Sequence, residues 1–292
     1  MRGLFVGLMT LDCIYQAQRP PQANEKLVAQ AAMMAAGGPA TNAAVAFAAL
    51  GGQATVMAAV GQHPVTALLR EDMAQVGVTL RDLSPSRSDP PPLSSIVVSQ
   101  SGDRAVISRN AEGLQIDPQT MALDGGLTDG VLTDVNVVLL DGHQMALSQR
   151  IALMAKSLGI PVVVDAGSWK PGFDQVLALA QVVIASANFR PPDPHGDDGM
   201  AYFQGLGIPQ IAITQGEYPI VVSDQGRLGE LAVPATTVVD TLGAGDIFHG
   251  AFCHAICDAG GVSFSAALTQ ASQVASLSCR YFGTRAWIPY SN

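Results

Sequence analysis

The feature of this chain that most constrains its fold is an alternation of two kinds of segment along most of its length. Short apolar runs rich in Val and Ile are separated by longer stretches rich in Ala and Leu. Buried parallel strands are continuous apolar runs, and strands that alternate with helices connect by right-handed crossovers that cover both faces of a sheet. The alternation predicts an α/β fold, with strands at 4–8, 54–59, 135–140, 162–165, 182–184, 211–214 and 220–223 and helices at 41–50, 65–76, 145–158, 173–180 and 199–205.

Two segments interrupt this alternation. Residues 12–35 hold strand-like pieces around a turn rich in Pro and Gln, and residues 93–109 predict a hairpin of two strands, 93–100 and 104–109. We expect both segments to pair as one small sheet, a lid over the edge where open α/β folds bind ligands. Two unrelated surface hairpins are the alternative. The predicted core is then 1–11, 36–90 and 111–292, and the predicted lid is 12–35 and 91–110.

The last third of the chain has a different character. A strand is predicted at 230–233, a Gly-rich turn at 243–245, and two helices at 244–258 and 263–279. No internal repeat is present. We expect these elements to belong to the same α/β body.

Charge and hydropathy exclude two classes of partner. The chain has 24 acidic and 15 basic residues, only three of them lysines, so we expect no nucleic-acid partner. The longest weakly polar stretch, 176–187, is shorter than the ~20 apolar residues of a membrane-spanning helix, so we expect no membrane contact. The four cysteines lack the spacing of a disulfide framework or a metal site, which predicts reduced thiols in a cytoplasmic protein.

The clearest chemical signal is residues 240–251, DTLGAGDIFHGA, where an acid at the end of a predicted strand precedes a Gly-rich turn and a helix. The first N–H groups of a helix attract anions, because they lack intrahelical acceptors and lie at the positive end of the dipole. Asp246 falls in that first turn, where it could take a proton from a hydroxyl while the N–H groups stabilise charge on a phosphoryl group. A Gly-rich helix start in which Asp246 only complements the dipole is the alternative.

Other nucleotide-binding motifs are absent. The sequence has no Walker loop, no dinucleotide-binding fingerprint and no protein-kinase signature. Phosphate chemistry in this chain is therefore expected to proceed without a P-loop.

A second signal is residues 37–44, GGPATNAA. Paired glycines permit close approach of the backbone to a ligand, and Asn42, in the first turn of a predicted helix, has the donors and the acceptor that suit a vicinal diol. Helix capping by Thr41 or Asn42 is the alternative. Asp12 is placed at the end of the first predicted strand, where acids form turns as often as they bind ligands.

Together these motifs resemble the ribokinase-like (PfkB) family of carbohydrate kinases. Residues 37–44 are similar to its N-terminal signature and residues 240–251 to its C-terminal signature, and the shared order of motifs spans nearly the whole chain. The resemblance implies a ribokinase-like three-layer α/β/α sandwich with a small β-sheet lid, and ATP-dependent phosphorylation of a small sugar. It also implies Mg²⁺ with the ATP, a monovalent cation near Asp240, and a homodimer formed through the lid.

The resemblance assigns roles to individual residues. Asp246 would be the catalytic base, with an anion hole made by Gly243, Ala244 and Gly245. The residues implied to hold the sugar are Asp12, Gly38 and Asn42. The residues implied to bind the nucleotide are Asn188, Thr214, Gly216 and Thr241.

Within the family, the chain resembles most the branch of sulfofructose kinase and ketohexokinase, through residues 11–15, 245–250 and 284–289. Lys26 and Asn110 occupy positions where that branch has groups near the anionic end of the substrate. Its arginine after the mid-chain strand is replaced here by His143, which leaves both an anionic sugar and a neutral ketose open. Pro191 stands where many relatives have a glutamate that helps to organise Mg²⁺, and no metal ligand is assigned.

Two other functions stay open at this stage. The missing glutamate is compatible with a ribokinase-like protein that binds a sugar or nucleotide as a sensor and turns over poorly. The intact Asp246 argues against a sensor, because a binding protein has no use for a base. A nucleoside kinase of the same fold would share every motif above.

Overall fold

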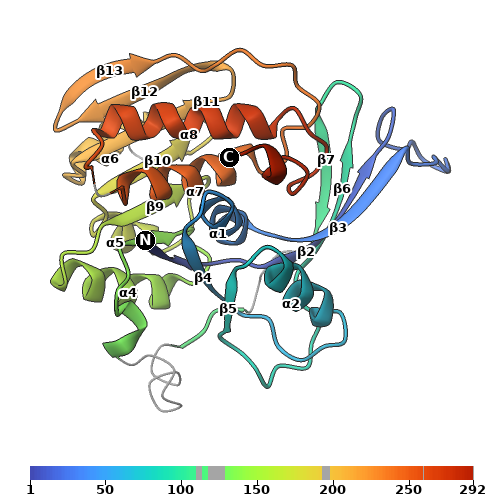
Figure 1. Cartoon of the computed structure of the whole chain (residues 1–292), viewed down its shortest axis with the longest axis horizontal. Helices are drawn as coiled ribbons and strands as arrows, with labels where there is room; N and C mark the ends of the chain where they lie inside the picture. The colour runs from blue at the N-terminus through green and yellow to red at the C-terminus, as the bar shows by residue number, and fades with distance from the viewer. Residues whose placement is uncertain (110–113, 118–128, 193–197, 259, 292) are drawn as a thin grey trace.

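The computed structural model describes residues 1–109, 114–117, 129–192, 198–258 and 260–291. The body is a nine-stranded sheet in the order β13-β12-β11-β10-β9-β8-β1-β4-β5 (Figure 1). Neighbours from β5 to β11 are parallel, and β12 and β13 are added antiparallel at one edge. The strands are β1 (Arg2–Val6), β4 (Gln53–Ala58), β5 (Thr79–Asp82), β8 (Val137–Leu140), β9 (Val162–Ala166), β10 (Val182–Ser186), β11 (Gln210–Gln215), β12 (Tyr218–Asp224) and β13 (Arg227–Leu231).

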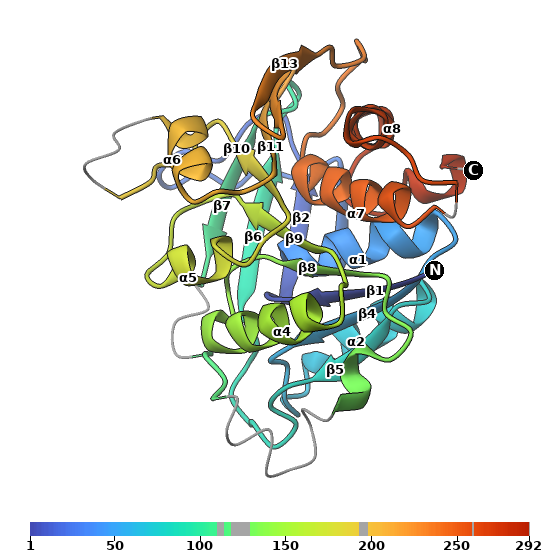
Figure 2. The ribbon, with the colours of Figure 1, turned by 90° about the vertical axis from the view of Figure 1, so that its left-hand side faces the viewer.

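Helices cover both faces of this sheet (Figure 2). Successive side chains of a strand point to opposite faces, so β1 sends Phe5 into one hydrophobic core and Leu4 and Val6 into the other. The first core is completed by α1 (Pro39–Ala49), α2 (Thr66–Gln75), α7 (Ala244–Ile256) and α8 (Phe264–Ser278). The second is completed by α4 (Met145–Ser157), α5 (Phe173–Leu177) and α6 (Gly199–Gly205). The predicted three-layer α/β/α sandwich is confirmed.

A second, four-stranded sheet has the order β3-β2-β6-β7. It consists of β2 (Thr10–Gln16), β3 (Ala31–Gly37), β6 (Leu93–Val98) and β7 (Arg104–Ser108), and β2 pairs in parallel with β6. The two segments that interrupt the alternation thus form one small sheet, which stands at one end of the body in Figure 1. Because β1 ends at Val6 and β2 begins at Thr10, this sheet lies where the parallel strands of the body end.

Three local predictions were wrong. The first strand ends at Val6 rather than residue 8, so Asp12 lies inside β2 and not at the end of the first strand. No strand precedes Asp240, because the amides of Val239 and Asp240 donate to the carbonyl of Cys279 at the end of α8 instead of to a neighbouring strand. The last strand lies at 227–231 rather than 230–233.

A two-residue turn explains that shift. Gln225 and Gly226 both have positive φ, 51° and 79°, and Asp224 pairs with Arg227, as in a type I′ hairpin. The turn therefore starts β13 at Arg227, in a polar, exposed edge segment without an apolar pattern. Strand β5 was not predicted, because its sequence, TLRD, likewise lacks an apolar pattern.

Two further observations concern the surroundings of the protein. No helix in the described ranges is long and apolar enough to cross a membrane. Cys13, Cys253, Cys257 and Cys279 are all free thiols.

Candidate active site

The Gly-rich turn before α7 brings that helix close to α1. Gly243 is the N-cap of α7 with φ 71°, a backbone conformation that favours glycine. A side chain there would lie 3.1 Å from Thr284 and 3.4 Å from the Asn42 amide nitrogen. Further along α7, a Cβ at Gly250 would collide with the carbonyl of Ala43. Glycine thus permits the close approach of the two signature segments.

The start of α1 is capped by a residue from another strand end. Gly38, the N-cap, has φ 99°, and neither Thr41 nor Asn42 caps the helix with its side chain. Instead, Asp141 accepts a hydrogen bond of 3.1 Å from the amide of Ala40. The capping alternative for Asn42 is therefore wrong, and its amide is available for other contacts.

Asn42 and Asp246 are brought together by these two helix starts. Asn42 Nδ2 donates to Asp246 Oδ2 at 2.9 Å. Burial and the neighbouring Asp165 carboxylate raise the pKa of Asp246 to about 7, against the hydrogen bond from Asn42 and the charge of His249, which lower it. A carboxylate with a pKa near neutrality is suited to proton transfer at physiological pH.

The first-turn N–H groups of α7 lie beside this carboxylate. Helix geometry leaves the first four N–H groups, from the N-cap Gly243 to Asp246, without partners inside the helix. The N–H of Ala244 lies 3.3 Å from the carbonyl of Thr241, and that of Ile247 donates to Gly243 at 2.8 Å. Gly243, Gly245 and Asp246 therefore offer the N–H groups best placed to receive an anion.

Asp12 lies on the buried face of the small sheet. Its carboxylate accepts a hydrogen bond of 2.6 Å from the Thr10 hydroxyl, and a Cβ at Gly37 on the adjacent strand would collide with it. Burial raises the pKa of Asp12, against hydrogen bonds from Thr10 and Ser94 and the charge of Arg285, which lower it. Asp12 is thus a buried, oriented acceptor for a hydroxyl ligand.

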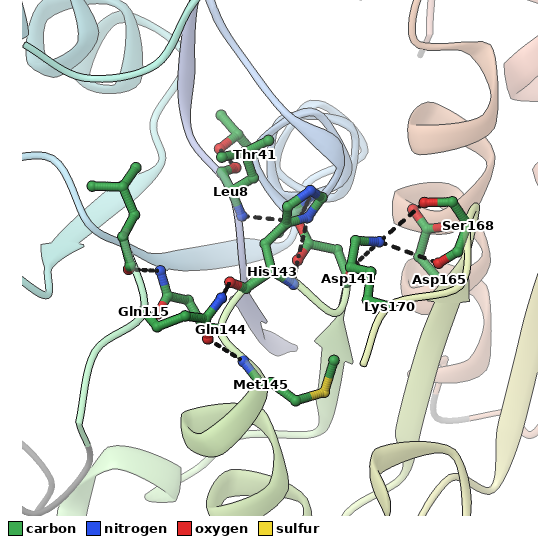
Figure 3. A network of polar contacts seen from close by, with 12 residues as sticks. Leu8, Thr41, Gln115, Asp141, His143, Gln144, Met145, Asp165, Ser168 and Lys170 are labelled. Atoms are coloured by element: carbon green, nitrogen blue, oxygen red, sulfur yellow. Dashed lines mark hydrogen bonds and ion pairs between the residues drawn. The ribbon is translucent and has the colours of Figure 1, made fainter. Parts of the chain in front are cut away.

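Asp141 and His143 follow β8 and were not predicted as a pair (Figure 3). Asp141 also accepts the amides of Leu8 and His143, each at 2.9 Å, and the His143 ring nitrogen lies 3.2 Å from it. Burial opposes ionisation of Asp141, but His143 and these amides outweigh it and hold the pKa at about 2. Asp141 is therefore an ionised group that joins β8 to the start of α1.

Lys170 reaches the same place from the loop after β9 (Figure 3). Its Nζ lies 3.3 Å from both oxygens of Ser168 and 3.5 Å from the carbonyl of Asp141. Asp165, at the end of β9, lies 3.7 Å from His249 Nε2. The acids Asp141 and Asp165 could have been predicted from their positions at the ends of apolar strands.

The residues expected to bind the nucleotide gather at two neighbouring strand ends. Asn188 is exposed just after β10, Thr214 lies at the end of β11, and Gly216 makes the turn to β12 with φ 65°. A cavity of about 200 Å³ opens there, lined by residues that include Ala187 and Gln215. Thr241, in the turn before α7, contacts the β6–β7 hairpin of the small sheet instead: its hydroxyl donates to Gly102 and accepts from Arg104.

Three other residues that the sequence analysis assigned to the substrate or to a monovalent cation have no contact in the described residues with Asn42 or Asp246. Lys26 is exposed in the loop between β2 and β3. Asn110 lies outside the described residues. Asp240 is buried, and its two oxygens accept the amides of Leu242 and Gly283, both at 2.8 Å, so it ties the turn before α7 to the C-terminal segment.

The described residues offer no cluster of three or more His, Cys, Asp or Glu side chains that could hold a metal ion. Magnesium retains several waters and is usually held by one or two carboxylates together with phosphate oxygens.

Comparison with known proteins agrees with this geometry. A family model described as pfkB family carbohydrate kinase matches residues 3–290. The chain belongs to the pfkB family of carbohydrate kinases. As a member of this family it is a phosphotransferase whose acceptor is a sugar hydroxyl.

Individual relatives of this pfkB kinase are distant. It is 27% identical to a ribokinase of Bacillus subtilis, covering 100% of this chain and 98% of that protein. It is 24% identical to an ATP-dependent ribose-1-phosphate kinase of Halopiger xanaduensis, covering 86% and 83%. Among solved structures, Arabidopsis thaliana ribokinase complexed with ribose and ATP superposes with a TM-score of 0.75 at 22% identity, covering 99% and 94%. These relatives do not show the sulfofructose kinase or ketohexokinase branch, which stays a prediction.

Proposed function

We propose that this pfkB kinase transfers the γ-phosphoryl group of ATP to a hydroxyl of a small sugar, with Asp246 as the general base. The observation that carries the proposal is the position of Asp246. It lies in the first turn of α7, beside N–H groups that can receive an anion, and is bonded to Asn42 from the other signature. Its pKa of about 7 lets it be ionised before the reaction and accept the hydroxyl proton during it.

Each end of the site takes one substrate in this proposal. Asp12, Gly38 and Asn42 hold the sugar, because Asp12 on β2 and Asn42 on α1 are buried hydrogen-bonding groups and Gly38 starts α1. Asn188, Thr214, Gly216 and Thr241 line the path of the nucleotide, whose phosphates would hold a Mg²⁺ ion that supplies positive charge to the transferred group. As the phosphoryl group moves, the N–H groups of Gly243 and Gly245, from the predicted anion hole, and that of Asp246 stabilise its negative charge, whereas the N–H of Ala244 is directed at the carbonyl of Thr241.

Two side chains bear on whether the sugar substrate is neutral or anionic. Lys170 is a partly buried cation whose hydrogen bonds go to neutral oxygens, one of them on Asp141, and His143 contacts the same Asp141. Both favour a polar or anionic end on the substrate, as does the relative that acts on ribose 1-phosphate. Lys26 and Asn110 stay predictions for the same end.

The deciding experiment is a substrate panel with purified protein and MgATP. Ribose, ribose 1-phosphate, fructose, sulfofructose, sugar acids and nucleosides are compared by ADP release. Turnover with a sugar above the background ATP hydrolysis supports the proposal, and a preference for a nucleoside would replace it with a nucleoside kinase. Tight calorimetric binding of a sugar without turnover would instead establish a sensor. Repeating the active assay with K⁺ exchanged for a large organic cation tests the predicted monovalent cation near Asp240.

We also propose that the protein is a homodimer formed through the small sheet, in the cytoplasm. The outer face of that sheet carries a row of directly paired residues across all four strands: Met34, Cys13, Ser95 and Ile107. None of these is charged, and Met34 and Ile107 are 60% and 80% exposed. A wide uncharged sheet face of this kind is suited to a second copy of itself.

Sedimentation measures this association directly. Ile107→Asp is expected to give a monomer. Leu153→Asp, which changes an exposed residue on α4, is the matched control and should leave a dimer. A wild-type protein that sediments as a monomer at micromolar concentration would contradict the proposal.

A further inference from the structure

Arg285, in the segment after α8, has no role in the function proposed above. Its side chain is 13% exposed, and the guanidinium is bonded to three separate elements of the fold. Nη2 donates to the carbonyl of Ala36 on β3 at 2.6 Å and to Asp72 on α2 at 2.9 Å. Nη1 donates to Asn42 Oδ1 on α1 at 3.2 Å. One cation therefore joins the small sheet, the body and the residue that contacts Asp246.

The contact with Asn42 determines which way its amide faces. A side-chain amide has an oxygen that only accepts and a nitrogen that only donates, whereas a guanidinium only donates. With Arg285 on one side, the stable orientation directs Oδ1 at the guanidinium and Nδ2 at the Asp246 carboxylate. The reversed amide would place donor against donor at Arg285 and oxygen against oxygen at Asp246, so both contacts would be lost together.

We propose that Arg285 is a positioning residue that fixes the Asn42 amide and, through it, the orientation of the Asp246 carboxylate. This inference rests on the proposed role of Asp246 as the base. Because Arg285 also bonds to the backbone of β3, the position of the small sheet and the orientation of the base are set by the same side chain.

The chain of contacts has a measurable consequence for the ionisation of Asp246. The hydrogen bond from Asn42 favours the ionised carboxylate, so its loss raises the pKa of Asp246 above about 7. The other groups that act on this carboxylate come from different elements: Asp141 after β8, Asp165 on β9 and His249 on α7. None of these depends on Arg285. A purely structural Arg285 would lower the active fraction by the same factor at every pH.

The test is the pH dependence of kcat at saturating sugar and MgATP for Arg285→Met, Asn42→Ala and the double variant. We expect Arg285→Met to lower kcat at neutral pH by about 10-fold or more and to move the acidic limb to higher pH. Asn42→Ala should move the limb in the same direction. The double variant should match Asn42→Ala alone, because residues in one chain of contacts are not additive.

Three controls make the result decisive. Arg280→Met changes an exposed arginine five positions earlier and should keep the wild-type profile. Arg285→Lys keeps the charge but lacks the planar guanidinium that donates to several partners at once, and it replaces the Met variant in the test if that variant does not fold. It should shift the limb in the same direction. An unmoved limb, or effects that add in the double variant, would overturn the proposal. If Asp246→Asn retains turnover, the proposed base has failed instead, so the two failures are distinguishable.

Discussion

Asn42 and Asp246 lie 204 positions apart in the chain, and Asn42 Nδ2 donates to Asp246 Oδ2 at 2.9 Å. Each residue is in the first turn of its helix, α1 or α7, and both helices start at a glycine with positive φ. The two signature segments therefore meet at their helix starts, where the backbone N–H groups and the carboxylate are directed at the same place.

The first prediction concerns Asp246. Asp246→Asn should lower kcat by ~10²–10⁴, because an amide cannot accept the hydroxyl proton, while the dissociation constants of ATP and sugar change little. Turnover by ADP release and binding by calorimetry separate these effects. The control is Asp89→Asn, which changes an exposed acid that pairs with Arg87 and has no place in the proposed site, and it should retain activity. Near-native turnover of Asp246→Asn would show that another group is the base.

The second prediction concerns pH. A base must be ionised before the reaction, and the pKa of Asp246 is raised to about 7. We therefore expect kcat/KM to fall about tenfold for each pH unit below that value. Rates measured from pH 5 to 9 in buffers of constant ionic strength check this limb. A profile that stays flat down to pH 5 would contradict the raised pKa.

The third prediction separates sugar binding from catalysis. Asp12 is a buried acceptor bonded to Thr10 on β2, whereas Asp246 lies in the first turn of α7. Asp12→Ala should therefore raise KM for the sugar about 10- to 100-fold, as expected for lost hydrogen bonds to a charged group, with KM for ATP unchanged. Equal increases in both KM values would show that Asp12 supports the fold rather than the sugar.

The elements that the sequence predicted well are those whose signal is local. Apolar runs at β8, β9 and β10 predicted buried strands, and the glycines at 37–38 and 243–245 predicted the two helix starts. By contrast, the short polar strand β5 and the exposed strand β13 carry no apolar pattern, and the helix predicted at 173–180 ends at Leu177.

The contacts around the base could not be read from the sequence. Arg285 meets Asp72 across 213 positions and Asn42 across 243, and no spacing rule connects residues at such separations. The capping of α1 by Asp141 likewise depends on the parallel pairing of β1 with β8, which only the assembled sheet defines.

The fourth prediction concerns stability. The pKa of Asp141 falls from 3.8 to about 2 on folding. Its ionised form therefore stabilises the folded protein at any pH above the unfolded value, and this contribution disappears as the pH falls through about 2. The shift corresponds to about 2 kcal/mol, so Asp141→Asn should lower the free energy of unfolding by about that amount at pH 7.

Urea unfolding at pH 7 and at pH 3 measures this contribution. The difference in stability between wild type and Asp141→Asn should be smaller at pH 3, where the unfolded carboxyl is already protonated. A variant as stable as wild type at pH 7 would show that the amides of Leu8, Ala40 and His143 are satisfied equally well by a neutral side chain.

The last prediction concerns the charge of the substrate and uses the three lysines of the chain. Lys170 and His143 both contact Asp141, the hydrogen bonds of Lys170 go to neutral oxygens, and Lys26 is exposed in the loop of the small sheet. If the sugar carries an anionic end, Lys170→Met and Lys26→Ala should each raise its KM several-fold without changing KM for ATP. Lys156→Ala, on the exposed side of α4, is the matched control. A neutral ketose gains little from either cation. An unchanged KM for the sugar in both variants would therefore exclude an anionic group on the substrate and favour a neutral sugar.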